Sequence, residues 1–247
     1  MRIAIFSDIH GNELALLAAL ADLKALGAVD QYWFLGDYAA AGPRPAECIR
    51  HCLALVAEHD SETVRCIGGN TDRYLVHGER KRLPAAQDAG EWEERKRLIQ
   101  ETSANLDWTI AQLGWEEYEF LRAGIGVEIA QELPGYGWCH AYHAVPGDDE
   151  GVLSPDTPEH IALDFLLDRE GSLGIGGHVH LQYDRVVGHW RLLNPGSIGS
   201  SRDAPGQAQW ALFHFQGSQL QVTLRAVPYD VSAFQQQMRQ SGFPHPF

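Results

Sequence analysis

The chain opens with short apolar runs that alternate with amphipathic stretches. Residues 2–7 (RIAIFS) form an apolar, β-branched run typical of a buried strand, and residues 14–26 carry apolar positions at helical spacing. The same order follows in the strand-like run at 32–36, the helical stretch at 45–58 and the strand-like run at 63–67. Strands that alternate with helices predict a parallel sheet with helices outside it. We therefore expect an α/β fold.

The pattern changes between residues 73 and 134, where we expect a charged helical insertion. Its apolar side chains keep helical spacing between polar faces: Trp92, Ile99, Leu106, Ile110 and Leu113. We expect this stripe to pack on the core, and a mobile lid is the alternative.

Strand-like runs return after the insertion. They occupy residues 136–140 and 172–177, with a helical stretch near 159–169 between them. The last third alternates in the manner of antiparallel strands, and a short helix is expected from 231 to 240. We expect one domain over residues 1–247, with the insertion at 73–134 and a C-terminal tail helix within 231–247.

Composition and charge narrow the classes of function. The formal net charge of −14 and the pI near 5.2 describe an acidic protein whose field repels polyanions, so we expect no stable nucleic-acid binding. No apolar run approaches the roughly 18 residues that span a bilayer, and we expect a cytoplasmic protein without membrane contact. The cysteines show no metal-binding or disulfide spacing, and Cys139 is expected in the core.

Polar side chains with metal-binding chemistry follow the apolar runs, and ligands of open α/β sheets bind beyond the carboxyl ends of the strands. Asp8 and His10 flank one position, so both can turn to the same cation, and Asp37 can bridge two cations. The amide oxygen of Asn70 is a neutral ligand. Imidazoles favour Mn, Fe, Zn, Ni or Co over Mg or Ca. The expected ligands are Asp8, His10, Asp37, Asn70, His140, His178 and His180.

Each of these residues has an ordinary structural role open to it. Asp8 suits a helix N-cap, Asp37 suits a turn, and Asn70 after two glycines suits a left-handed turn position. A single His-x-His pair is often incidental. It is the complete set, in order and at strand ends, that favours a metal site.

At these positions the sequence resembles the calcineurin-like metallophosphoesterases. The similar motifs are Asp8-Ile9-His10, Gly36-Asp37, Gly69-Asn70-Thr71-Asp72, His140, and Gly177-His178-Val179-His180. The stretch 194–199 (NPGSIG) is similar to a signature of the small bacterial and archaeal branch that includes the YfcE-type phosphodiesterases. The resemblance implies a four-layer αββα sandwich.

The resemblance also implies a centre of two divalent transition-metal ions, manganese first, with Fe, Ni, Zn or Co as alternatives. One ion is then held by Asp8, His10, Asp37 and His180, and the second by Asp37, Asn70, His140 and His178. Asp37 and Asn70 thereby belong to the catalytic set as well.

The third motif departs from the family pattern at Thr71, where most members carry a histidine. A threonine hydroxyl donates a hydrogen bond but is a poor general acid. Asp72 is expected to orient a ligand or the motif backbone, with a helix N-cap as the alternative. Tyr142 and His143 are expected to line the mouth of the site, with His143 as a substitute acid, and Arg202 is a weak candidate for phosphate contact.

The function that we expect is a metal-dependent phosphodiesterase that hydrolyses a small phosphodiester or a nucleotide with water. Without a histidine at position 71, esters with good leaving groups are favoured. A phosphomonoesterase or protein phosphatase is the alternative enzyme, and a nuclease is disfavoured by the acidic charge. A non-catalytic metal-binding scaffold is the alternative from another class.

Overall fold

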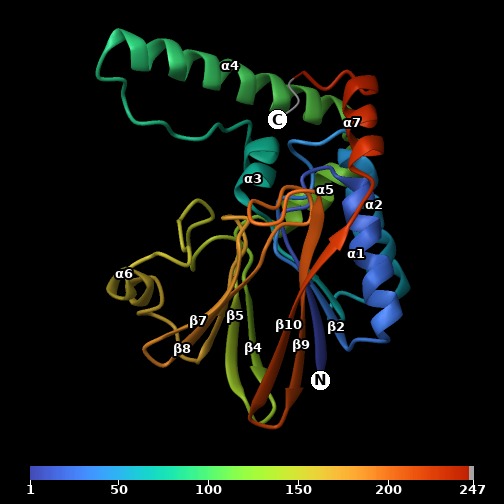
Figure 1. Ribbon diagram of the computed structural model, residues 1–247, viewed down its shortest axis with the longest axis vertical. Helices are drawn as coiled ribbons and strands as arrows, with labels where there is room; N and C mark the ends of the chain where they lie inside the picture. The colour runs from blue at the N-terminus through green and yellow to red at the C-terminus, as the bar shows by residue number, and fades with distance from the viewer. Residues whose placement is uncertain (245–247) are drawn as a thin grey trace.

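The computed structural model describes residues 1–244 of the chain and contains two five-stranded sheets that pack face to face (Figure 1). The first sheet contains β1 (Arg2–Phe6), β2 (Gln31–Phe34), β3 (Val64–Cys66), β9 (Gln207–Gln216) and β10 (Gln219–Pro228), in the order β10-β9-β1-β2-β3. The second contains β4 (Ile129–Leu133), β5 (Gly137–Ala141), β6 (Leu173–Ile175), β7 (Gln182–Val187) and β8 (Trp190–Pro195), in the order β4-β5-β6-β8-β7.

Helices lie on the outer faces of both sheets and beyond one end of them (Figure 1). They are α1 (Glu13–Leu26), α2 (Pro45–Glu58), α3 (Asn70–His77), α4 (Ala89–Gln112), α5 (Trp115–Gly124), α6 (Glu159–Asp164) and α7 (Val231–Gln240). In Figure 1, α1 and α2 lie outside the first sheet and α6 lies outside the second. The four-layer αββα sandwich that the motifs implied is therefore confirmed.

Strand β1 explains why the opening run is apolar at consecutive positions. It pairs in parallel with β2 and antiparallel with β9, so it lies inside its sheet. Ile3 and Ile5 point into the core between the sheets, while Ala4 and Phe6 point into the core under the helices. Because successive side chains of a strand alternate between faces, a strand that is buried on both faces carries apolar side chains at consecutive positions.

Helix α1 begins where its first turn is capped. The Asn12 side chain accepts a hydrogen bond from the backbone N–H of Ala15 at 3.1 Å, and Glu13 adds an acidic residue to the first turn. The helix buries Leu16 and Leu23 against the first sheet. This cap places the preceding loop, residues 7–11, at the carboxyl end of β1.

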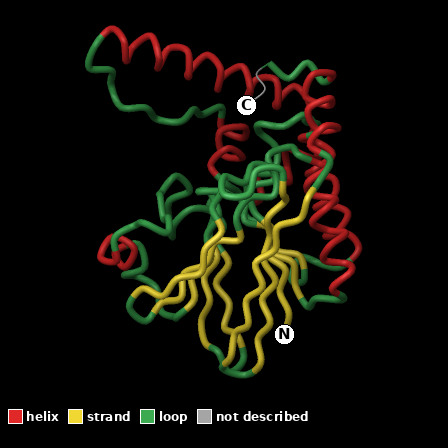
Figure 2. The backbone as a smooth tube through the Cα atoms, in the orientation of Figure 1, coloured by secondary structure: helices red, strands yellow, loops and turns green. Residues whose placement is uncertain are grey.

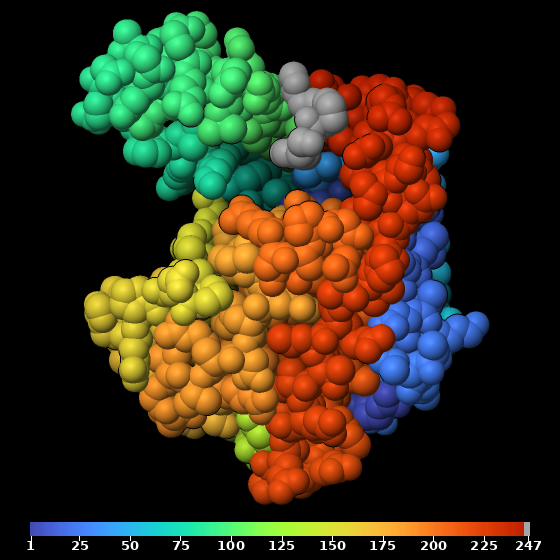
Figure 3. Space-filling view, in the orientation of Figure 1, coloured from blue at the N-terminus to red at the C-terminus, as the bar shows by residue number. Residues whose placement is uncertain are grey.

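The segment 73–134 is only partly the helical insertion that the sequence predicts. It contains most of α3, all of α4 and α5, and also strand β4, which pairs with β5 at the edge of the second sheet. Of the apolar stripe, Leu106 is buried and Leu113 packs partly buried against the core, whereas Ile110 is exposed. Trp92 and Ile99 are exposed, because the outer half of α4 extends beyond the sandwich (Figure 3).

The C-terminal helix agrees with the sequence pattern. Helix α7 spans Val231–Gln240, and residues 245–247 of the predicted tail lie outside the described part. None of the helices within residues 1–244 is both long enough and apolar enough to cross a bilayer.

Candidate metal centre

The site residues lie in loops that gather at one end of both sheets, below α3 and α4 (Figure 2). Each main position follows the end of a strand by two to four residues: Asp8 after β1, Asp37 after β2, Asn70 after β3, His143 after β5 and His178 after β6. The carboxyl ends of these five strands therefore bring together side chains that are far apart in sequence.

The first cluster consists of Asp8, His10 and His180. The two imidazole Nε2 atoms lie 3.1 Å apart. Asp8 Oδ1 lies 3.1 Å from Nε2 of His180 and 3.8 Å from Nε2 of His10. All three side chains are at least four-fifths buried. These separations match the roughly 3.3 Å edge of a tetrahedral shell with metal–nitrogen distances of 2.0–2.1 Å.

The second cluster consists of Asp37, Asn70, His143 and His178. Asn70 Oδ1 lies 3.1 Å from Nε2 of His143 and 3.0 Å from Nδ1 of His178. Asp37 Oδ2 lies 3.5 Å from Nε2 of His143 and also 3.6 Å from Nε2 of His10 in the first cluster. The Asp37 carboxylate thus lies between the two clusters.

The backbone of the site is held in an uncommon conformation. Asp8, His10, Asp37, His178 and His180 all have positive φ angles, between 51° and 64°, and they make up five of the six such non-glycine residues within 1–244. A left-handed conformation of this kind costs about 1–3 kcal/mol per residue and persists only where the surroundings enforce it. Its concentration in both clusters indicates a functional site rather than ordinary turns.

Hydrogen bonds fix the tautomers of three histidines. Nδ1 of His10, His143 and His180 lies within 2.7–3.0 Å of a backbone carbonyl oxygen. A carbonyl only accepts, so Nδ1 carries the hydrogen and a neutral ring presents a lone pair at Nε2. In the neutral form of each ring, these lone pairs would face each other and carboxylate or amide oxygens, an arrangement that needs a proton or a cation between them. Asp8 Oδ1 is buried without a hydrogen-bond partner among the described residues. Such convergent acceptors require cations, and the oxygen and nitrogen donors fit divalent transition metals.

The pKa values follow from the same crowding of acceptors. Burial opposes ionisation of Asp8, but the nearby charge of His180 lowers the pKa of Asp8 to about 2. Burial also opposes the charged form of His143, yet the Asp37 carboxylate raises the pKa of His143 to about 10. The pKa of His180 is raised by Asp8 against the effect of burial. The buried carboxylates thus favour positive charge at these two positions.

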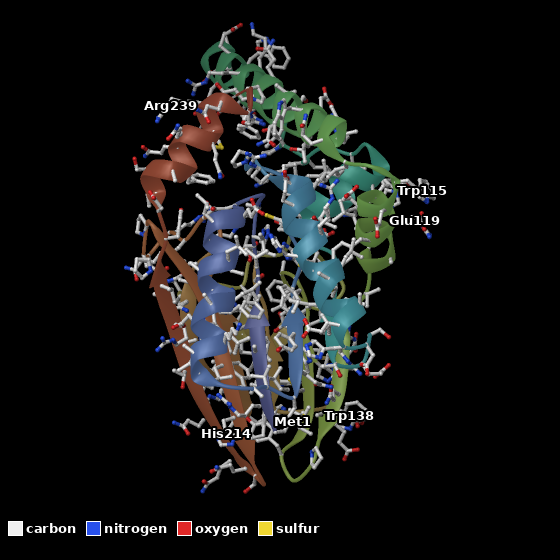
Figure 4. The ribbon with its side chains drawn as sticks, turned by 90° about the vertical axis from the view of Figure 1, so that its right-hand side faces the viewer. Met1, Trp115, Glu119, Trp138, His214 and Arg239 are labelled. Atoms are coloured by element: carbon white, nitrogen blue, oxygen red, sulfur yellow. The ribbon has the colours of Figure 1, made fainter. Side chains whose placement is uncertain are left out.

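His140, one of the expected ligands, lies outside both clusters. His140 lies inside β5, and its Nε2 is 2.8 Å from the carbonyl oxygen of Glu170. Its neighbour Cys139 points into the core between the sheets, so His140 points to the opposite face, towards Trp190. Trp138 on the same strand lies at the end of the sheets remote from α4 (Figure 4). The strand runs on to Ala141, so the loop position belongs to His143.

His143 and Tyr142, expected at the mouth of the site, both line the groove beside the second cluster, but neither is open to solvent. His143 is 3% exposed and belongs to the second cluster, with both ring nitrogens engaged, so it is no free acid at the mouth. Tyr142 is 1% exposed and packs in the core between the second sheet and α6. Arg202 has an exposed side chain, and its backbone N–H donates to the carbonyl of His180.

Asp72 holds the backbone at the second cluster. Its carboxylate accepts hydrogen bonds from the N–H groups of Asp37 at 2.7 Å, Gly69 at 2.9 Å and Tyr38 at 3.1 Å. It therefore caps α3 and also joins α3 to the loop after β2. Burial and the nearby Asp37 carboxylate raise the pKa of Asp72 to about 7.

Thr71 lies beside the same carboxylate. Its backbone N–H donates to Asp37 Oδ1 at 2.9 Å, and its hydroxyl oxygen is buried without a hydrogen-bond partner among the described residues. The hydroxyl therefore has unused hydrogen-bonding capacity beside the second cluster.

A groove of about 540 Å³ begins at Gly68 and His143 and continues between α3 and the loop at 147–150. Its walls carry Arg73, Arg80 and Arg82 together with five acidic side chains. Arg73 bonds to Asp149 and Glu150 across the groove. The groove has the volume of a small-molecule site and is polar.

Comparison with known proteins agrees with this geometry. The family model of the calcineurin-like phosphoesterases matches residues 1–182. The crystal structure of a metallophosphoesterase from Sphaerobacter thermophilus has 25% sequence identity and a TM-score of 0.68, covering 99% of this chain and 95% of that one. An uncharacterized protein of Methanocaldococcus jannaschii is 26% identical over 98% of this chain and 93% of its own length.

A symmetrical bis(5'-nucleosyl)-tetraphosphatase of Klebsiella pneumoniae is 28% identical over 62% of this chain and 51% of its own length. The match to the family model includes every side chain of both clusters. It ends at residue 182, before β8 and the segments that follow. The chain belongs to the calcineurin-like phosphoesterase family.

Proposed function

We propose that this chain is a metal-dependent phosphodiesterase that hydrolyses a small phosphodiester or a nucleotide. The observation that carries the proposal is the pair of buried acceptor clusters that share Asp37. Asp8, His10 and His180 would hold one ion. Asn70, His143 and His178 would hold the other, and Asp37 would bridge both. His143 thus takes the role first assigned to His140.

Two divalent cations, when bound, supply Lewis-acid chemistry, because they polarise phosphoryl oxygens and lower the pKa of water. The protein groups orient this chemistry. Carbonyl contacts at Nδ1 hold three imidazoles with Nε2 directed inward, and Asp72 holds the backbone of Asp37. Preorganised groups of this kind cost no rearrangement at the moment of reaction.

Thr71 favours diesters over monoesters. The family position of a histidine is occupied by a hydroxyl that can donate a hydrogen bond to a phosphate oxygen but cannot serve as a strong acid near neutral pH. His143 is held within the second cluster and does not replace that acid. A leaving group that departs without protonation must be weakly basic, so aryl phosphodiesters should react faster than alkyl phosphomonoesters.

The groove beside His143 would accept the part of the substrate beyond the phosphate. Its volume suits a small molecule, and its mixed charge suits a polar group with hydroxyls or amides. The relative from Klebsiella pneumoniae is named a bis(5'-nucleosyl)-tetraphosphatase, so a dinucleoside tetraphosphate belongs in the substrate panel.

The test is hydrolysis by the manganese-loaded protein of bis(p-nitrophenyl) phosphate, p-nitrophenyl phosphate, glycerol phosphate and a symmetrical dinucleoside tetraphosphate. We expect the aryl diester to have the highest kcat/KM among the three simple esters. In Thr71→His we expect the kcat/KM for glycerol phosphate, whose alkoxide leaving group needs a proton, to rise relative to that for bis(p-nitrophenyl) phosphate. The expected change in this ratio is about tenfold or more, the usual effect of a placed acid.

The matched control is Thr102→His, which adds an imidazole to the partly buried flank of α4 and should leave the ratio unchanged. If wild-type protein hydrolyses glycerol phosphate as fast as the aryl diester, the phosphodiesterase proposal fails. Two bound ions without turnover of any ester would favour the non-catalytic scaffold.

A further inference from the structure

The turn at residues 194–200 (NPGSIGS) contains no acidic or imidazole side chain, yet it lies against the first cluster. It begins with the last two residues of β8 in the second sheet and bonds to the loop after β1 in the first sheet. Asn194 and Ser197 are 1% and 0% exposed. Buried polar side chains are retained where they are fully hydrogen-bonded, so their partners indicate what the turn does.

The backbone of Asp8 receives most of these hydrogen bonds. The hydroxyl of Ser197 donates to the carbonyl oxygen of Asp8 at 2.8 Å, and the N–H of Gly199 donates to the same oxygen at 2.9 Å. The N–H of Ile198 donates to the carbonyl of Ser7 at 3.0 Å. A side chain at Gly199 would collide with the carbonyl of Ile9, so the two segments lie as close as backbones allow.

The same turn also bonds to the loop that contains His178 and His180. The side-chain amide of Asn194 donates to the carbonyl of Gly177 at 2.7 Å, directly before His178. The carbonyl of Ser200 accepts from Nδ1 of His180 at 2.8 Å, which directs Nε2 of His180 into the cluster. The hydroxyl of Ser197 also accepts from the N–H of Ser200 at 2.8 Å, so one buried oxygen ties the two contacts together.

These contacts explain how the strained backbone persists. Asp8 and His180 both have left-handed φ angles, 56° and 58°, which the local chain alone disfavours. The turn bonds to the main chain of Asp8 and to the ring of His180, and these residues supply two of the three side chains of the first cluster. Towards the second cluster the turn reaches only the carbonyl of Gly177, through Asn194. Ser197 itself makes no contact with a second-cluster side chain among the described hydrogen bonds.

We propose that Ser197 is a positioning residue, whose hydroxyl sets the metal affinity of the first cluster by holding Asp8 and, through Ser200, His180 in their binding geometry. This proposal rests on the two-metal function proposed above. The second cluster depends instead on Asp72 and should be insensitive to Ser197.

The test is titration of manganese into metal-free protein by calorimetry, comparing wild type with Ser197→Ala. We expect one of the two binding events to weaken by about 10–100-fold, the usual effect of losing an outer contact to a ligand, while the other stays unchanged. Thr109→Ala is the matched control, because it removes a fully buried hydroxyl that bonds to Asn105 on α4. Both of its affinities should match wild type.

A double-mutant comparison identifies the cluster. Asp8→Asn should remove the first-cluster event, and adding Ser197→Ala to it should then cause no further loss. Equal weakening of both events, or a further loss in the Asp8→Asn background, would overturn the proposal. If Ser197→Ala lacks the circular dichroism of the folded protein, Ser197→Cys keeps the size with a weaker donor and should shift the same event less. Wild-type protein that binds fewer than two ions would refute the proposed function itself.

Discussion

The two clusters of the metal centre are built differently. The side chains of the first cluster come from two loops and can be identified from the sequence. Asp8 and His10 flank one residue, and His180 is the last residue of a Gly-His-Val-His motif. The second is drawn from the ends of β2, β5 and β6 and the start of α3, and each of its side chains comes from a separate segment. Local motifs therefore give the whole first cluster, whereas in the second they give Asp37, Asn70 and His178 but not His143.

Their supports differ in the same way. The backbone of the first cluster is held by the turn at 194–200. The backbone of the second is held by Asp72, whose carboxylate accepts hydrogen bonds from three backbone N–H groups. Asp37 lies within 3.6 Å of an imidazole from each cluster, so the two are physically joined. Substitutions can accordingly be sorted by whether they affect one cluster, the other or both.

The largest effect is expected from Asp37→Asn, because this carboxylate would contact both ions. We expect kcat/KM on an aryl phosphodiester to fall on the order of 10³-fold or more, and Asp8→Asn to cost about 10²-fold. Elemental analysis should find neither ion bound stoichiometrically in Asp37→Asn and one ion in Asp8→Asn. Equal, mild losses in both variants would mean that Asp37 does not bridge.

The second prediction separates His143 from His140. His143→Ala should lower kcat/KM by about 10²-fold, since a cluster side chain is removed. His140→Ala should change kcat/KM less than about threefold and lower the free energy of unfolding by about 1 kcal/mol, through loss of one hydrogen bond. Steady-state kinetics and urea unfolding measure both. A large kinetic loss in His140→Ala alone would reverse the assignment.

The third prediction concerns the support of the second cluster. Asp72→Asn turns an N–H donor towards backbone N–H groups, so we expect the second binding event for manganese to weaken by about 10–100-fold. The first event should change less. Asp22→Asn, which weakens an ion pair with Arg225 outside the centre, is the control and should leave both events intact. Calorimetric titration decides between these outcomes.

The smallest expected effect is the release of one proton from His143 when a metal ion binds. The pKa of His143 is raised to about 10, so this ring is protonated at neutral pH and must release its proton when a cation takes its place. Affinity at the second cluster should then rise with pH by about tenfold per unit between pH 7 and 8.5, for one proton released. Calorimetry in two buffers of different ionisation enthalpy measures the release. A heat independent of buffer would show that His143 is already neutral.

The sequence by itself determined much of this protein. The apolar runs predicted β1, β2 and β3, and helical spacing predicted the bounds of α2 and α7. Burial on one or both faces dictates which side chains a strand or helix carries. The motifs around Asp8, Asp37 and Asn70 indicated the loops of the centre, since ligands follow the carboxyl ends of parallel strands.

Tertiary structure decided what local pattern leaves open. The end of β5 depends on its pairing with β4 and β6, and that pairing carries the strand past His140 and puts His143 in the loop. Helical spacing placed Trp92 and Ile99 on one stripe with Leu106, but only the position of α4 against the sandwich determined which of them is buried. The contact of Ser197 with Asp8, 189 residues apart, exists because two sheets meet there. Side-chain periodicity reports which face of an element is buried, whereas register and the packing of elements arise from contacts between distant segments.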